Sequence, residues 1–154
     1  MDVADLSKDY LLRAQEAAPD DMLNNLMCGI AYLHRAMQRQ TDNRQHQISQ
    51  ALAFFDRYRK LRGGPSVEVE YNMGRIFNHL GQSTSTLHYL AESMTGIINL
   101  AVRHYQRALE VQSAELSSAD WGLKRTTAFN LCQIYLATGS LPMAKKLAHQ
   151  WLSF

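Results

Sequence analysis

The stretch YNMGRIFNHLG, residues 71–81, brings together residue types that could carry out chemistry. Its two glycines, Gly74 and Gly81, could form a loop whose backbone amides hold a phosphate. Arg75 could bind an anion, and His79 could transfer a proton near neutral pH. Which of these roles is open depends on whether the stretch is a loop or a regular element.

The apolar residues of this stretch favour a helix. Their spacing of i, i+3, i+4 and i+7 defines one face of an α-helix. The residues concerned are Met73, Ile76, Phe77 and Leu80. Gly81 follows them and is expected to end the helix in a left-handed conformation. Gly74 lies inside the helix, where glycine costs roughly 1 kcal/mol relative to alanine. We therefore expect a second helix, centred near Ala101–Tyr105, to approach its backbone closely.

Motifs of catalysis are absent from the sequence. It contains no Gly-x-x-x-x-Gly-Lys loop, no Gly-x-Ser-x-Gly elbow and no His-Glu-x-x-His. The six histidines include no pair at i, i+4. His79 and His104 could act together as bases on facing helices, but polar positions on a binding or solvent face explain them better. We expect no catalytic residue, no cofactor and no metal, and we expect Cys28 and Cys132 to be small buried side chains.

One pattern occurs three times: a large apolar residue, a small residue, two further residues and an aromatic one. The small and aromatic members are Gly29 and Tyr32, Gly74 and Phe77, and Cys132 and Tyr135. After each comes a second helical signal with alanine and an aromatic or small residue four positions later, as in Ala51 and Phe55. This arrangement resembles the tetratricopeptide repeat, in which small residues let two antiparallel helices cross closely.

These signals predict an all-α tetratricopeptide-repeat α-solenoid of about seven antiparallel helices, one of them unusually long. The predicted helices are 4–18, 21–40, 46–62, 67–80, 84–112, 120–138 and 141–152. The chain would be one array over 1–154, with a half repeat 4–19, repeats 21–62 and 67–112, a linker 113–119 and a terminal repeat 120–154. Because a solenoid does not begin with a lone second helix, the chain is expected to be a fragment of a longer array.

The charge is unevenly distributed, although the net charge of the 154 residues is only +2. Residues 1–21 carry six acids against two bases, a net charge of −4. Residues 35–62 carry seven bases against two acids, a net charge of +5. The basic segment could be a solvated helix face, or it could contact an acidic partner or nucleic acid. No apolar run is long enough to span a membrane, and no signal peptide is present, so we expect a soluble intracellular chain without membrane contact.

Three phrases are more specific than a generic repeat. They are AYLHRAMQRQTDNRQHQISQALAFFDRYRKLRG (31–63), YNMGRIFNHLG followed by LAVRHYQRALE, and TAFNLCQIYLATGSLPMAKKLAHQW (127–151). Together they resemble the C-terminal repeats of the tetratricopeptide scaffold subunit of transcription factor IIIC, the fungal tau assembly subunit family, over roughly residues 10–154. The 82–98 insertion and the QSTST turn depart from that pattern.

This resemblance implies a nuclear scaffold that holds other subunits of transcription factor IIIC for initiation by RNA polymerase III. It implies contact with transcription factor IIIB through the full-length subunit. No direct contact of this fragment with nucleic acid is expected. Two other functions stay open: a nucleic-acid-contacting helical module that uses the basic 35–62 segment, and a chaperone adaptor.

In such an array the first helices of the repeats line a partner-binding groove. The predicted groove residues are Leu26, Ile30, Leu33, His34, Tyr71, Arg75, Asn78, His79, Phe129, Gln133 and Leu136. The possible basic contacts are Arg35, Arg39, Arg44, Arg57 and Arg59. Arg75 with Asn78 and His79 could hydrogen-bond an extended peptide or an acidic side chain.

Overall fold

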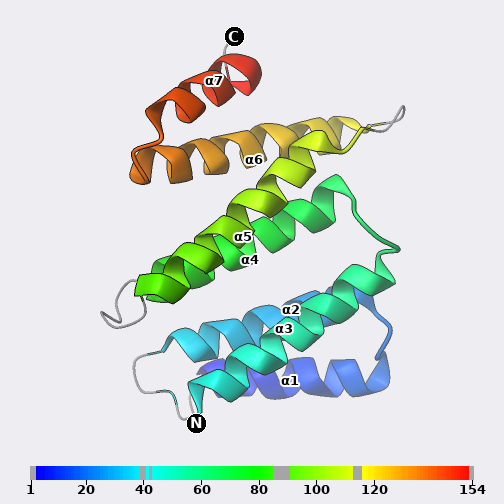
Figure 1. Ribbon diagram of the computed structural model, residues 1–154. Coiled ribbons are helices and arrows are strands. Elements are labelled where there is room, and N and C mark those ends of the chain that lie inside the picture. Colours follow the sequence, from blue (N-terminus) through cyan, green and yellow to red (C-terminus); the bar gives the residue numbers. More distant parts are fainter. Residues whose placement is uncertain (1–2, 39–40, 42, 85–90, 113–115, 153–154) are drawn as a thin grey trace. The chain divides into compact units, whose positions relative to one another are not determined.

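The computed structural model describes residues 3–38, 41, 43–84, 91–112 and 116–152 (Figure 1). Seven α-helices and no strand are found in these residues, which confirms the all-α prediction. The chain divides into two compact units, Met1–Gly64 and Pro65–Phe154, and each is described by itself. That the repeats form one continuous array from 1 to 154 stays a prediction.

The first unit consists of α1 (Val3–Ala17), α2 (Met22–Met37) and α3 (Arg44–Leu61). Helix α2 packs against both α1 and α3. It begins after Asp21, whose carboxylate accepts a 2.7 Å hydrogen bond from the backbone amide of Asn24 and so caps the helix. This cap stabilises the start of α2, the helix that contacts both other helices of the unit.

A buried side-chain amide fixes the turn between α1 and α2. Asn25 is fully buried, and its Nδ2 donates to the carbonyl oxygens of Pro19 at 3.0 Å and of Asp21 at 2.7 Å. A buried amide without such partners would cost roughly 1–3 kcal/mol. These contacts were not anticipated from the sequence, because an asparagine in an amphipathic stretch gives no sign that it is buried.

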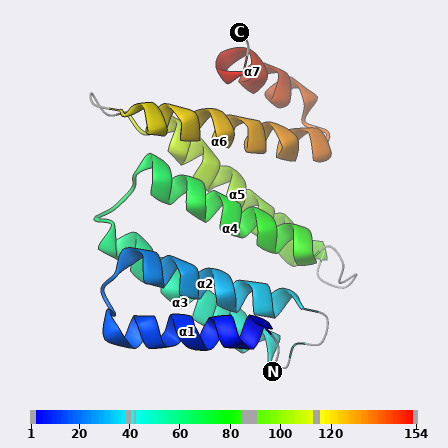
Figure 2. The same cartoon turned by 180° about the vertical axis from the view of Figure 1, so that it is seen from behind.

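The second unit consists of α4 (Val67–Thr84), α5 (Ala91–Glu110), α6 (Ser118–Ala137) and α7 (Leu141–Trp151). Helix α4 packs on α5, α6 packs on α7, and α6 also contacts α4 and α5. Figure 2 shows this unit from behind, with α4 and α6 in front of α5. Its core includes Ala101 and Tyr105 from α5, Leu131 and Tyr135 from α6, and Ala144 from α7.

Glycines mark the close approaches within the first two helix pairs. A Cβ atom at Gly74 would lie 2.4 Å from Cδ1 of Tyr105, and one at Gly29 would lie 2.4 Å from Cε1 of Phe55. Real Cβ atoms do not come this close, so each aromatic ring lies directly on a glycine backbone. The predicted approach of the Ala101–Tyr105 helix to Gly74 is therefore confirmed.

In the third helix pair, α6 and α7, the residues that correspond to the glycine and to the aromatic residue both differ in size from those of the first two pairs. Cys132 takes the place of the glycine on α6, and Ala148 follows Ala144 on α7 by the same four positions that separate Tyr105 from Ala101. The Sγ atom of Cys132 lies 3.6 Å from the carbonyl oxygen of Ala144. A larger residue on the first helix is thus matched by a smaller one on the second, which keeps the interior filled.

Two predictions about the end of α4 were wrong. Helix α4 continues through Gly81 to Thr84, so Gly81 does not end it. A Cβ atom at Gly81 would lie 2.4 Å from Cδ1 of Ile98, so this glycine also allows α5 to approach. Nor does the predicted helix 84–112 begin at residue 84, because Thr84 belongs to α4; the described part of that helix is α5, Ala91–Glu110. Part of the predicted insertion, residues 85–90, lies outside the described residues.

A carboxylate–imidazole pair is buried between α4 and α5. Oε2 of Glu70 and Nδ1 of His104 are 2.7 Å apart, and the two side chains are 3% and 9% exposed. The ring of Phe77 stacks on the His104 ring at 5.3 Å between centroids. His104 therefore lies in the interior of the unit and not on the binding or solvent face expected from the sequence, whereas His79 is exposed.

A buried lysine holds the end of α5. Nζ of Lys124, a residue of α6 that is 3% exposed, donates to the carbonyl oxygens of Leu109 at 3.0 Å and of Val111 at 2.5 Å. The ammonium group also lies 5.6 Å from the ring centroid of Trp121 and 5.7 Å from that of Trp151. Burial lowers the pKa of this lysine. The last carbonyls of a helix attract a cation, so Lys124 joins α5 to α6.

We expect the second unit to lose stability in alkali because of Tyr105. Burial raises the pKa of its phenol to about 12, although the hydrogen bond with Asn130 works in the opposite direction. Since the folded-state pKa is the higher one, this contribution is complete below the unfolded pKa of about 10 and is lost as the pH rises through about 12. The free energy of unfolding should fall by about 2–3 kcal/mol over that interval.

Urea unfolding at successive pH values measures this effect. Tyr105→Phe should show a smaller alkaline loss, and Tyr10→Phe, at a residue that is 64% exposed, should keep the loss of the unaltered chain. An unchanged alkaline loss in Tyr105→Phe would show that Tyr105 is not its source.

Candidate partner-binding surfaces

The predicted groove residues of α4 share one face of that helix. Arg75 is exposed, and its guanidinium carbon lies 5.7 Å from the ring centroid of the half-buried Tyr71. His79 is also exposed, while Asn78 is half-buried and its Oδ1 accepts a 3.5 Å hydrogen bond from Nε2 of Gln82. Stacking on Tyr71 orients the guanidinium while leaving it accessible, so Arg75 can bind a carboxylate.

The predicted groove residues of α6 lie on an exposed face of the neighbouring helix. Phe129 and Leu136 are 51% and 48% exposed, and Gln133 is exposed between them. Their spacing of i, i+4 and i+7 places all three on one side of α6. The exposed phenylalanine and leucine on this face are available for contact with another protein.

A small cluster connects the α4 and α6 faces. The rings of Tyr71 and Tyr105 are 6.5 Å apart, and Nδ2 of Asn130 on α6 donates to the Tyr105 hydroxyl at 3.5 Å. Because α4 and α6 pack against each other, the Arg75 face adjoins the helix that carries Phe129. We call Tyr71, Arg75, His79, Phe129, Gln133 and Leu136 the α4–α6 surface.

The predicted groove residues of α2 differ in burial. Leu26 and Ile30 are half-buried and His34 is exposed, as a groove would require. Leu33 is 3% exposed and therefore belongs to the core, contrary to the prediction. It lies four positions after Gly29, on the side of α2 that the close approach of Phe55 covers.

The possible basic contacts do not gather into one patch. Arg35 is half-buried, and the Nη2 atom of Arg44 donates to the carbonyl oxygen of Gln38 at 3.1 Å. Arg57 pairs with Asp20 at 2.8 Å. Arg59 is exposed, but at 100° per residue it points about 160° away from Arg57 around α3. Arg39 lies outside the described residues. These four described arginines therefore do not form a continuous stripe along a phosphate backbone.

The described part of the chain contains neither a metal-binding cluster nor a membrane-spanning helix. No group of three or more His, Cys, Asp or Glu side chains there could hold a metal ion. No described helix has both the length and the hydrophobicity required to cross a membrane.

Comparison with known proteins relates the chain to transcription factor subunits. No family model matches it. The chain is 33% identical over 149 residues to the transcription factor tau 131 kDa subunit of Saccharomyces cerevisiae, 94% of this chain and 12% of that protein. It is 32% identical over 151 residues to the transcription factor tau subunit sfc4 of Schizosaccharomyces pombe, 95% of this chain and 14% of that protein. It is 35% identical over 147 residues to the human general transcription factor 3C polypeptide 3, 92% of this chain and 15% of that protein.

The matches cover nearly all of this chain but only a segment of each relative. The chain spans between 12% and 15% of the length of these proteins. The three relatives come from two yeasts and from human, and each is a subunit of a general transcription factor. With similarity along almost its whole length, the chain belongs to the family of the tetratricopeptide subunit of transcription factor IIIC.

Proposed function

We propose that this chain is a protein-binding scaffold segment of a transcription factor IIIC subunit, and that it binds another subunit of the same factor on the α4–α6 surface. The bound segment would place apolar side chains against Phe129 and Leu136 and an acidic side chain against Arg75. The chain would have no catalytic role.

The observation that supports this proposal most directly is the pairing of an accessible cation with exposed apolar side chains on two adjoining helices. Arg75 lies over the Tyr71 ring, and Phe129 is 51% exposed on the next helix. Apolar side chains that become buried supply much of the affinity of a protein contact, and a charged residue such as arginine contributes to its specificity. The names of the relatives, all transcription factor subunits, indicate which proteins should be tested first.

The wider assembly follows from the same proposal. The full-length subunit would work in the nucleus and would reach transcription factor IIIB through repeats outside this segment. Two bases of the 35–62 segment, Arg57 and Arg44, would not contact nucleic acid, because they already have partners within the chain.

Co-purification of the chain with each of the other subunits of the factor tests the proposal. At least one subunit should be retained by the unaltered chain. Arg75→Glu and Phe129→Ser should each weaken that retention about tenfold or more, because they alter the charge and the apolar anchor of the surface. Circular dichroism should show that both variants remain folded, since both side chains are exposed.

Matched variants away from the surface serve as controls. Arg13→Glu makes the same charge change on α1, and Leu141→Ser removes an apolar side chain that is 61% exposed on α7. Both should retain the partner. If no subunit is retained, or if the controls weaken retention as much as Arg75→Glu and Phe129→Ser do, the proposal is wrong. Retention on a tRNA-gene duplex that falls steeply with salt would instead favour the nucleic-acid alternative.

A further inference from the structure

A pocket opens between α5, α6 and α7. It shares α6 with the α4–α6 surface, but Arg75 of that surface lies on α4. The volume of the pocket is about 290 Å³. The buried residues Leu131 and Tyr135 of α6 form its floor, and Leu147, Met143 and Trp151 of α7 contribute further apolar lining. This volume is large enough for a bulky apolar side chain and lies at the lower limit of sites for drug-sized ligands, which are typically about 300–1,000 Å³.

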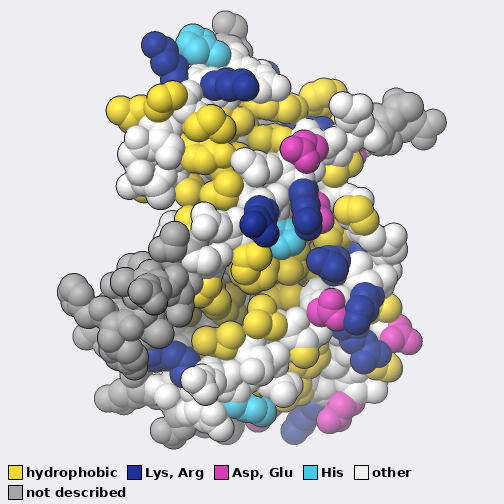
Figure 3. Space-filling view, in the orientation of Figure 1, with side chains coloured by type: hydrophobic (Ala, Val, Ile, Leu, Met, Phe, Trp, Pro, Cys, Tyr) yellow, Lys and Arg dark blue, Asp and Glu magenta, His cyan; other side chains and the backbone are white. Residues whose placement is uncertain are grey.

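Part of the apolar lining of the pocket is exposed to solvent. Met143 is 47% exposed although it lines the pocket. In Figure 3 hydrophobic side chains gather between α7 and α5 on this face, with Lys and Arg side chains on both sides of them. Exposed apolar surface of this kind is typical of an interaction site, because covering it with an apolar side chain of a partner removes it from water.

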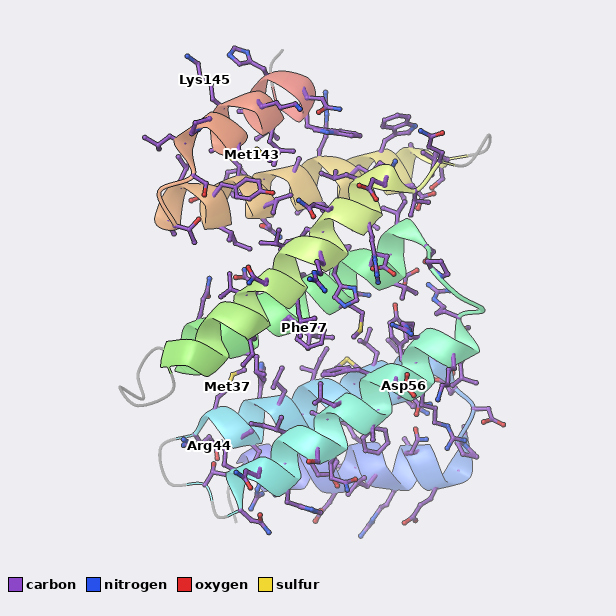
Figure 4. The ribbon with its side chains drawn as sticks, viewed as in Figure 1. Met37, Arg44, Asp56, Phe77, Met143 and Lys145 are labelled. Atoms are coloured by element: carbon purple, nitrogen blue, oxygen red, sulfur yellow. The ribbon has the colours of Figure 1, made fainter. Side chains whose placement is uncertain are left out.

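Bases outnumber acids around the pocket. Arg103, Arg107 and Lys146 stand against Glu110, while Lys145 points away from the pocket (Figure 4) and Glu92, the other acid of α5, is 18 positions before Glu110. Helix α7 contains no acidic residue at all. Lys146 of α7 and Glu110 of α5 both line the pocket. An acidic partner would be attracted to this surface, whereas a basic one would be repelled.

We propose that this pocket binds an acidic segment of another protein through one bulky apolar side chain, and we call it the α5–α7 pocket. The apolar side chain would enter between Met143, Leu147 and Trp151. Carboxylates on either side of it would contact Lys146 and the arginines of α5. The contact is independent of the α4–α6 surface, so a single copy of the chain could hold two segments.

The test uses the chain and short synthetic peptides. Each peptide has a run of aspartate and glutamate around one central residue, which is tryptophan, phenylalanine, leucine or alanine. Fluorescence anisotropy measures the affinity of each labelled peptide. At least one bulky central residue should bind about tenfold more tightly than alanine, since its side chain would be removed from water in the pocket.

Helix α7 offers two matched pairs of variants. Met143→Glu alters a lining residue, while Leu141→Glu makes the same kind of change at a residue that is 61% exposed and does not line the pocket. Lys146→Glu alters a lining charge, while Lys145→Glu alters the preceding residue, which points to the opposite side of α7 from the pocket (Figure 4). Met143→Glu and Lys146→Glu should each weaken binding about tenfold, and their controls less than about threefold.

Several results would overturn the proposal. If no peptide binds better than its alanine counterpart, the pocket holds no anchor. If Lys145→Glu weakens binding as much as Lys146→Glu, the attraction is general and does not involve the pocket. If sedimentation shows that the chain dimerises and that Met143→Glu alone makes it monomeric, the occupant is a second copy. Failure of Arg75→Glu to disturb these peptides would be expected and would leave the proposed function to its own test.

Discussion

Gly74→Leu should unfold the second unit or reduce its free energy of unfolding by about 3 kcal/mol or more. A Cβ atom at this position would lie 2.4, 2.5 and 3.0 Å from three ring carbons of Tyr105. That ring is fully buried and its hydroxyl is hydrogen-bonded to Asn130, so it cannot move aside without separating α5 from α4. Thermal and urea unfolding followed by circular dichroism measure the effect.

Gly122 supplies the matched control for Gly74. It also lies within a helix, α6, but a Cβ atom there would meet nothing within 4 Å. Gly122→Leu should be neutral or should stabilise the chain by up to about 1 kcal/mol, because leucine favours the helix more than glycine does. In a Tyr105→Ala background, Gly74→Leu should cost much less than in the unaltered chain. Equal melting of the Gly74 and Gly122 variants would refute the packing explanation.

Glu70→Ala should cost about 3 kcal/mol, the second large effect. The substitution leaves the His104 ring buried between α4 and α5 without the carboxylate that lies 2.7 Å from it. The stacked Phe77 ring offers no replacement, because it cannot accept the ring N–H as a carboxylate does. Urea unfolding of Glu70→Ala against the unaltered chain measures the cost.

A double variant separates this explanation from simple loss of volume. Glu70→Leu/His104→Leu removes both polar groups and should recover most of the stability that Glu70→Ala loses. The exposed pair of Asp56 and Lys60, 2.6 Å apart, provides the comparison, and Asp56→Ala should have little effect because solvent screens that pair. A double variant no more stable than Glu70→Ala would mean that the unpaired His104 is not the source of the cost.

The helical stripe and the glycine packing were predictable because they depend on local periodicity. Met73 and Ile76 recur at helical spacing, and a glycine inside such a stripe indicates a close neighbour. Even the neighbour, Tyr105, followed from the repeated pattern of small and aromatic residues. These features require only that one helix pair resemble the next.

The end of α4 and part of the candidate surface were not predictable in this way. Gly81 fits a helix end and a helix interior equally well, and the approach of Ile98 from α5 decides between them. Leu33 carries the same apolar signal as Leu26, but only the position of the neighbouring helix determines that it is buried. A single stripe shows which residues avoid water without showing which of them another helix covers.

The sequence by itself determined that this protein is a set of antiparallel helices with small residues at their crossings, and which family it belongs to. Tertiary structure alone decided that Glu70 meets His104, 34 positions away, and that Lys124 reaches the end of α5. The α5–α7 pocket also depends on tertiary structure, because no pattern in the sequences of α5, α6 or α7 predicts it. The physical reason is that hydrophobic periodicity is encoded within one helix, whereas the partners of buried charges and the shape of a cavity depend on how several helices pack.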